Sequence, residues 1–178
     1  MGIEEYFKRG RSAEQYVQLL FESIGAQCEP VEKKYRPHYD LHCTLFSIDF
    51  TLEVKFDLMA SKTKNVAIEY HNPVANKPSG ISITKADFWV YCFTPKEVWI
   101  IPTTKLKKYI ETNPPKRIID NGGDGNASLY LYGKDALLKE FVRIDNLDNK
   151  SLLEVIKQCL AGSSESKKSP EKISSAGF

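Results

Sequence analysis

Residues 48–56 alternate strictly between apolar and polar side chains. The apolar positions are Ile48, Phe50, Leu52, Val54 and Phe56, and the polar positions are Asp49, Thr51, Glu53 and Lys55. A period of two is typical of a β-strand with one face on a core and the other in contact with water. The pattern therefore predicts a strand that carries Glu53 and Lys55 on the same polar face.

The preceding residues 38–45 alternate in the same way, with Asp40 among the polar positions. A two-residue turn at residues 46–47 would pair the two strands as a hairpin and set Asp40 opposite Glu53. Side chains in such a pair lie about 5 Å apart, so two carboxylates there repel unless a cation lies between them. Mg²⁺ takes oxygen ligands of this kind. The turn lacks the Gly or Asn that two-residue hairpins prefer, and a longer loop would shift this register.

The rest of the chain predicts a single α/β domain over residues 1–161. A first helix is expected at 12–24, capped by Ser12 and ended by Gly25. Residues 27–37 form a connection with room for a short strand, and the segments 38–45, 48–56 and 65–71 form a three-stranded antiparallel meander. Further strands are expected at 88–93, 98–101 and 129–132, and further helices at 103–110, 135–141 and 151–160. The Ser/Lys-rich residues 162–178 predict a disordered tail.

Composition limits the protein's class. The chain has 178 residues, 42% of them hydrophobic, which is enough for one sizeable core. The widely spaced Cys28, Cys43, Cys92 and Cys159 form no CxxC pair, so reduced thiols in a cytoplasmic protein are expected. Neither a signal peptide nor a membrane-spanning segment is expected, because the N-terminal residues are acidic and no apolar run is long enough.

A helix followed by a hairpin with Asp40 and then Glu53-Val54-Lys55 resembles the PD-(D/E)XK nuclease superfamily. Glu14, early in the first helix, matches a metal-site glutamate of the archaeal-type Holliday junction resolvases in that superfamily. Residues 78–90 are similar to a segment of small phage and bacterial nucleases. The resemblance covers roughly residues 10 to 110. It implies a restriction-endonuclease-like core, a mixed sheet flanked by helices. Tyr39 stands before Asp40, where the superfamily motif has proline.

The resemblance also implies a metal-dependent endodeoxyribonuclease that hydrolyses phosphodiesters, with branched DNA as one substrate class. Asp40, Glu53, Glu14 and the carbonyl of Val54 would hold Mg²⁺, for which Mn²⁺ would substitute. Lys55 would position water or stabilise developing charge. A role as general base would need a lowered pKa, which the neighbouring carboxylates oppose. Junction resolvases need two active sites, so a homodimer is implied as well, although no segment identifies its interface.

Contacts to DNA would come from local basic groups, because a net charge of +2 is too small to indicate a nucleic-acid-binding protein. Basic side chains near the predicted site in the sequence would follow the phosphate backbone. These are Arg9, Arg11, Lys34, Arg36, Lys62, Lys64 and Lys85. No recognition helix stands out, which favours cleavage directed by DNA structure, or nonspecific cleavage, over reading of a long target sequence.

Other interpretations remain open for several of these residues. Glu53 and Lys55 could form an ordinary solvated strand face, and Glu14 could complement a helix dipole. Glu69 is either another ligand or a surface acid. The three histidines, His38, His42 and His71, offer a rival metal site, but their spacing matches no common zinc pattern. The functional alternatives are a non-catalytic DNA-binding module that keeps the nuclease fold and a small α/β interaction protein.

Overall fold

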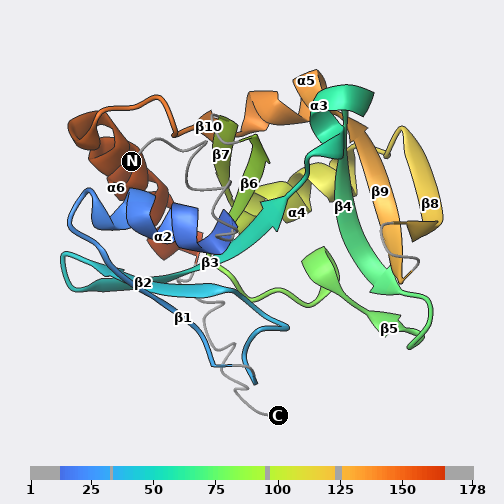
Figure 1. Ribbon diagram of the computed structural model, residues 1–178, viewed down its shortest axis with the longest axis horizontal. Helices are drawn as coiled ribbons and strands as arrows, with labels where there is room; N and C mark the ends of the chain where they lie inside the picture. Colours follow the sequence, from blue (N-terminus) through green and yellow to red (C-terminus); the bar gives the residue numbers. More distant parts are fainter. Residues whose placement is uncertain (1–12, 33, 95–96, 123–125, 167–178) are drawn as a thin grey trace, which may run out of the picture.

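The computed structural model describes residues 13–32, 34–94, 97–122 and 126–166, with side chains up to residue 161. Within this part of the chain the protein is an α/β fold with two sheets and five α-helices (Figure 1). The mixed six-stranded sheet has the order β1 (Gln27–Pro30), β2 (Leu41–Leu45), β3 (Ile48–Phe56), β6 (Phe88–Thr94), β7 (Glu97–Pro102) and β10 (Val142–Arg143). The antiparallel four-stranded sheet has the order β5 (Lys77–Pro78), β4 (Asn65–Asn72), β9 (Ala127–Gly133) and β8 (Arg117–Gly122).

The helices pack around these sheets. They are α2 (Ala13–Glu22), α3 (Met59–Thr63), α4 (Thr103–Thr112), α5 (Lys134–Leu137) and α6 (Asn149–Ser166), with 3₁₀ turns η1 (Gly80–Ser82) and η2 (Leu138–Glu140). The predicted 103–110 helix is α4, and the predicted 135–141 helix is divided between α5 and η2. Strand β8 is not among the predicted strands, because its side chains are mostly exposed and show no apolar alternation.

The predicted hairpin register is confirmed over β2 and β3. The ladder runs from Leu41 opposite Leu52 to Leu45 opposite Ile48. The turn residues Phe46 and Ser47 have φ values of 52° and 61°, the left-handed pair that a tight two-residue hairpin turn requires. The turn therefore adopts this geometry without the glycine or asparagine that usually supplies it.

The predicted meander is wrong in one strand. The segment after α3, now β4, leaves the hairpin and pairs with β5 and β9 in the other sheet. Instead β1, predicted only as part of a connection, pairs antiparallel with β2. The free edge of β3 pairs in parallel with β6, whose residues 88–93 are all buried and need cover on both faces.

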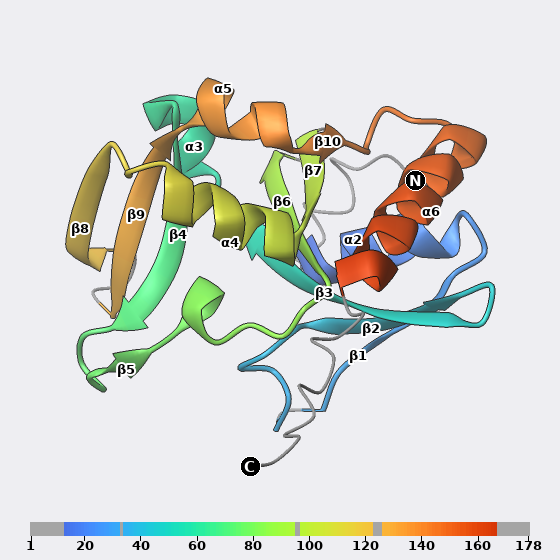
Figure 2. The same cartoon turned by 180° about the vertical axis from the view of Figure 1, so that it is seen from behind.

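The six-stranded sheet separates two hydrophobic cores. On one face α2 and α6 pack onto apolar side chains such as Phe50, Val54 and Phe88. On the other face, Trp89, Tyr91 and their neighbours pack against β4, β9 and α4. The two opposite views show α2 and α6 near one end of the molecule, and the four-stranded sheet at the other (Figures 1 and 2). Alternation along β3 thus sends Val54 into the first core, and Glu53 and Lys55 toward the second.

Two of the four cysteines depart from the expected reduced state. Cys28 of β1 and Cys43 of β2 stand directly opposite each other and form a disulfide. The sequence could not show this pairing because β1 was not recognised as a strand of the hairpin sheet. Cys92 and Cys159 are not disulfide-bonded, and burial raises the pKa of Cys92 to about 12, so that thiol stays protonated.

The C-terminal helix extends beyond the predicted domain boundary. Helix α6 continues to Ser166, although a tail was predicted from residue 162, and residues 167–178 lie outside the described part of the chain. Within the described residues, no helix combines the length and the apolar character needed to cross a membrane.

Candidate active site

The predicted acidic residues are brought to one place by the first helix and the hairpin. Glu14 lies in the first turn of α2, Asp40 immediately precedes β2, and Glu53 and Lys55 lie near the end of β3. Their side chains interact electrostatically: burial raises the pKa of Glu14, the carboxylate of Asp40 raises it further, and Arg36 and Lys55 lower it. The fold therefore brings together, from three segments of the chain, residues that are separated in the sequence.

Glu53 is the most buried acid of this group, with 7% of its side chain exposed. Its Oε1 atom forms an ion pair with the Lys55 ammonium, whereas its buried Oε2 atom has no hydrogen-bond partner among the described residues. Burial raises the pKa of Glu53, Lys55 opposes that rise, and the charges of Asp40 and Glu69 add to it. A buried carboxylate oxygen without a donor is costly, so this atom calls for a cation or a donor from outside the chain.

Asp40 is held by the backbone of the neighbouring strand. Its Oδ2 atom accepts a 2.7 Å hydrogen bond from the Val54 amide, and its own amide donates to the Leu52 carbonyl at 2.8 Å. The regular β2–β3 ladder ends at Leu41, so Asp40 does not stand in register opposite Glu53. Instead, the carboxylate of Asp40 takes the place of a strand carbonyl as the acceptor for the Val54 amide. Burial raises the pKa of Asp40, while the Val54 amide lowers it.

Lys55 remains a cation in this setting. Burial lowers its pKa, but the charge of Glu53 and the hydrogen bond to it outweigh burial, and the pKa is raised overall. Its ammonium also lies 5.3 Å from the centre of the Trp89 ring, within the range of a cation–π contact. An ammonium with a raised pKa can stabilise negative charge, and it is a poor general base near neutral pH.

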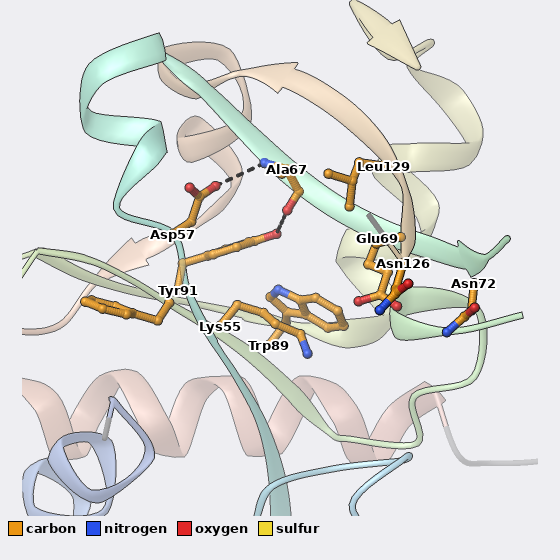
Figure 3. Close-up of a pocket in the computed structure, with 11 residues that line it drawn as sticks. Lys55, Asp57, Ala67, Glu69, Asn72, Trp89, Tyr91, Asn126 and Leu129 are labelled. Carbon is orange, nitrogen blue, oxygen red and sulfur yellow. Dashed lines mark hydrogen bonds between the residues drawn. The ribbon is translucent and has the colours of Figure 1, made fainter. Parts of the chain in front are cut away.

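Lys55 also lines a cleft between the two sheets. The cleft has a volume of about 440 Å³. Lys55, Trp89 and Tyr91 come from β3 and β6, and residues of β4 and β9 face them (Figure 3). The full lining is Lys55, Phe56, Asp57, Ala67, Glu69, Asn72, Trp89, Tyr91, Asn126, Ala127 and Leu129. The sequence pointed only to Lys55 and Glu69 from this set, because the others come together only when β6 pairs with β3 and β9 pairs with β4.

The predicted DNA-contacting residues are scattered in the structure. Arg36 lies close enough to Glu14 and Asp40 to lower the pKa of both. The Lys85 amide donates to the carbonyl of residue 38, which follows the Arg36-Pro37 segment.

The other predicted contacts contribute less to this site. Lys34 forms a 3.0 Å ion pair with Glu32 on the surface. Lys62 and Lys64 lie at the end of α3, where Lys64 lines a different cleft. Arg9 and Arg11 lie outside the described residues.

The three histidines do not form a common site. His38 contacts the Ile83 carbonyl through Nδ1 at 3.2 Å, whereas His42 lies within β2 and His71 within β4. No group of three or more His, Cys, Asp or Glu side chains in the described part of the chain is arranged to hold a metal ion. The rival zinc interpretation therefore has no support from the described residues.

The residues present still fit Mg²⁺. This ion demands octahedral coordination, keeps several water ligands, and is commonly held by one or two carboxylates together with substrate phosphate. Asp40 and Glu53 supply two neighbouring carboxylates, and the unpartnered Oε2 of Glu53 is an available oxygen ligand. Glu14 is the third acid of the group, through its interaction with Asp40.

No protein-family model matches the sequence, and comparisons with curated proteins and with solved structures find no significant similarity. Any function must therefore be argued from the residues of the site.

Proposed function

We propose that this protein is a Mg²⁺-dependent endodeoxyribonuclease of the PD-(D/E)XK type. The observation that carries the proposal is the buried carboxylate of Glu53, which pairs with Lys55 through one oxygen and keeps the other without a partner among the described residues. An ordinary solvated strand face would leave both groups in water. Burying a carboxylate beside two further acids destabilises the fold, and groups buried at such a cost are typical of functional sites.

The site residues would have two roles, binding the metal and stabilising charge on the phosphate. Asp40 and Glu53 would hold the metal, with Glu14 and the Val54 carbonyl as additional ligands. Bound Mg²⁺ lowers the pKa of a coordinated water and polarises the phosphate. Lys55, fixed by Glu53 and Trp89, would place its ammonium against the charge that develops on the phosphoryl oxygens. The backbone bond from Val54 holds Asp40 in place, so the site needs little rearrangement before reaction.

The local arrangement of elements supports the same proposal. Helix α2 precedes an antiparallel set of three strands, β1, β2 and β3, and the acids lie on the hairpin as in the core that the resemblance implies. The antiparallel meander therefore consists of β1, β2 and β3, whereas the sequence predicts residues 65–71 as its third strand. Action on branched DNA, activity with Mn²⁺ and a homodimer belong to the proposal as consequences of the resemblance, whereas the cytoplasmic location is a prediction from the cysteine pattern and the N-terminal sequence.

One observation favours a second function. The described acids do not form a three-ligand metal group, and Lys55 already neutralises one oxygen of Glu53. A non-catalytic DNA-binding module would keep such an arrangement without needing the metal. The two functions differ in whether phosphodiesters are cut.

Cleavage assays on matched variants distinguish them. The full-length protein is incubated with supercoiled plasmid and with synthetic four-way junctions, in Mg²⁺ or in EDTA. We expect cutting by the wild type in Mg²⁺ alone, and none by Glu53→Gln. Asp49→Asn is the matched control, because Asp49 is an exposed acid on the same strand, bonded to Thr44. DNA binding without cutting would establish the binding module, and cutting by Glu53→Gln would refute the assigned site.

A further inference from the structure

The cleft beside Lys55 has the mixed chemistry of a binding pocket rather than of a packing gap. Apolar surface comes from Ala127 and Leu129 of the four-stranded sheet, and from Phe56, which is 45% exposed. Polar groups come from the carboxylate of Glu69 and from side-chain amides at the rim. Figure 3 shows Glu69, Asn72 and Asn126 gathered across the cleft from Lys55 and Trp89.

The walls of the cleft are held together by hydrogen bonds between the two sheets. The Tyr91 hydroxyl donates to the Ala67 carbonyl at 2.8 Å, and the Ala67 amide donates to Asp57 at 3.2 Å (Figure 3). A Cβ at Gly80 would overlap the Glu69 carbonyl, so η1 packs closely against β4 at this residue. The cleft is therefore formed before any ligand binds, which lowers the entropic cost of binding.

Among the acids that line the cleft, Glu69 is the one open to a ligand, because Asp57 accepts hydrogen bonds from the Ala60 and Ala67 amides. Its side chain is half-buried in the cleft, and in the described part of the chain no hydrogen bond or ion pair satisfies its carboxylate. Its charge reaches Lys55, whose ammonium is already paired with Glu53. A carboxylate in this position accepts hydrogen bonds from an amino group, and amides such as that of Asn72 both donate and accept.

These features match one nucleotide. Carboxylate and amide groups are those that proteins use to bind base edges, and apolar surface suits the faces of an unstacked base. A volume of about 440 Å³ lies within the usual range for small-molecule pockets and has no room for a duplex. Lys55 belongs both to this cleft and to the catalytic group, so a nucleotide in the cleft would adjoin the phosphate to be cut.

We propose that the cleft between the two sheets binds one unpaired nucleotide next to the scissile phosphate, with Glu69 and Asn72 contacting the edge of the base. This inference rests on the proposed nuclease function and names its substrate class. The preferred DNA carries an unpaired or extruded nucleotide, as at a junction, a bulge or a frayed end. A nucleotide with weak pairing enters at the lowest cost, because less stacking and pairing energy is lost.

The test uses a duplex with 2-aminopurine either fully paired or at a single unpaired position. The full-length protein is added in Ca²⁺ for binding and in Mg²⁺ for cutting. We expect binding to raise 2-aminopurine fluorescence only at the unpaired position, and cutting of the unpaired substrate to be about tenfold faster than that of the duplex, the discrimination typical of one good base-edge contact. Ala127→Leu narrows the cleft, and Glu69→Gln removes the negative charge and replaces one of the two acceptor oxygens with an NH₂ donor. Both variants should reduce this preference to near unity.

Matched controls separate the cleft from the fold. Ala136→Leu adds the same volume at an exposed site on α5, and Glu111→Gln neutralises an exposed acid on α4, so both should keep the preference. Equal cutting of both substrates by the wild type would overturn the inference and leave the nuclease intact. Selective, cleft-dependent binding of the unpaired substrate without any cutting would overturn catalysis and leave the nucleotide pocket standing. A preference retained in both cleft variants would also overturn the pocket.

Discussion

Replacing Lys55 with methionine removes the ammonium and keeps the aliphatic side chain that crosses Trp89. The ammonium is the ion-pair partner of Glu53, whose side chain is 7% exposed, whereas Lys55 itself is 32% exposed. Two unit charges 4 Å apart attract by about 4 kcal/mol at an effective dielectric constant of 20. Removing one partner of a fully buried pair costs about 3–5 kcal/mol. Because Lys55 is partly solvated, we expect a loss of about 2 kcal/mol, or roughly 4–8 °C in Tm.

The measurement is urea unfolding and thermal unfolding in EDTA, as part of a double-mutant cycle with Glu53→Gln. In the Glu53→Gln background the same Lys55→Met change should cost far less, because no buried charge is left without its partner. Mg²⁺ should restore part of the loss in the single variant, since binding at 100 times the dissociation constant stabilises by about 2.7 kcal/mol.

The same variant tests the proposed chemistry. Loss of a group that stabilises transition-state charge costs about 10²–10³-fold in kcat, so Lys55→Met should cut plasmid that much more slowly. Lys157→Met serves as the control, because Lys157 pairs with Glu154 on the exposed surface of α6. Unchanged stability with no coupling to Glu53 would refute the buried ion pair. Cutting at the wild-type rate would refute the role of Lys55.

Three further predictions concern the stability of the fold. Asp57 accepts hydrogen bonds from the backbone amides of Ala60 in α3 and Ala67 in β4. Asp57→Ala removes this acceptor and should lower the free energy of unfolding by about 1–2 kcal/mol in urea titrations, and Asp57→Asn should lower it less. Replacing Cys28 and Cys43 with serine opens a crosslink of sequence separation 15 and should cost about 3 kcal/mol, a loss that a reductant reproduces in the wild type; equal stability with and without reductant would contradict it. Asp148 accepts a 2.7 Å bond from the Ser151 amide, which lowers its pKa, so its stabilisation is present above the unfolded pKa and disappears as pH falls through the folded one. Stability curves of the wild type and Asp148→Ala should therefore converge in acid, and a constant gap would refute this.

Local pattern was sufficient to predict the hairpin. The alternation along β3 and the two-residue turn place Leu52 opposite Leu41 and direct Glu53 and Lys55 to one face, as expected. Side-chain alternation is a property of the strand itself, so sequence reveals it directly. The position of Glu14 in the first turn of α2 follows in the same way from helix-start signals.

Long-range pairing could not be predicted from pattern. Strand β4 has the same alternation whether it pairs with β3 or with β9, and only the buried strand β6, which takes the free edge of β3, decides between them. The same limit hid the disulfide of Cys28 with Cys43, because it depends on a short strand without a pattern of its own.

The sequence by itself determined the chemistry available, namely three acids and a lysine with the periodicity to share a region of the fold. The tertiary structure decided how these groups are used. It ended the ladder at Leu41 so that Asp40 binds the Val54 amide, and it buried Glu53 with one oxygen lacking a partner among the described residues. It also set a second sheet against Lys55 to form the cleft. Burial and sheet pairing join residues far apart in the chain, and their energies depend on neighbours that periodicity does not identify.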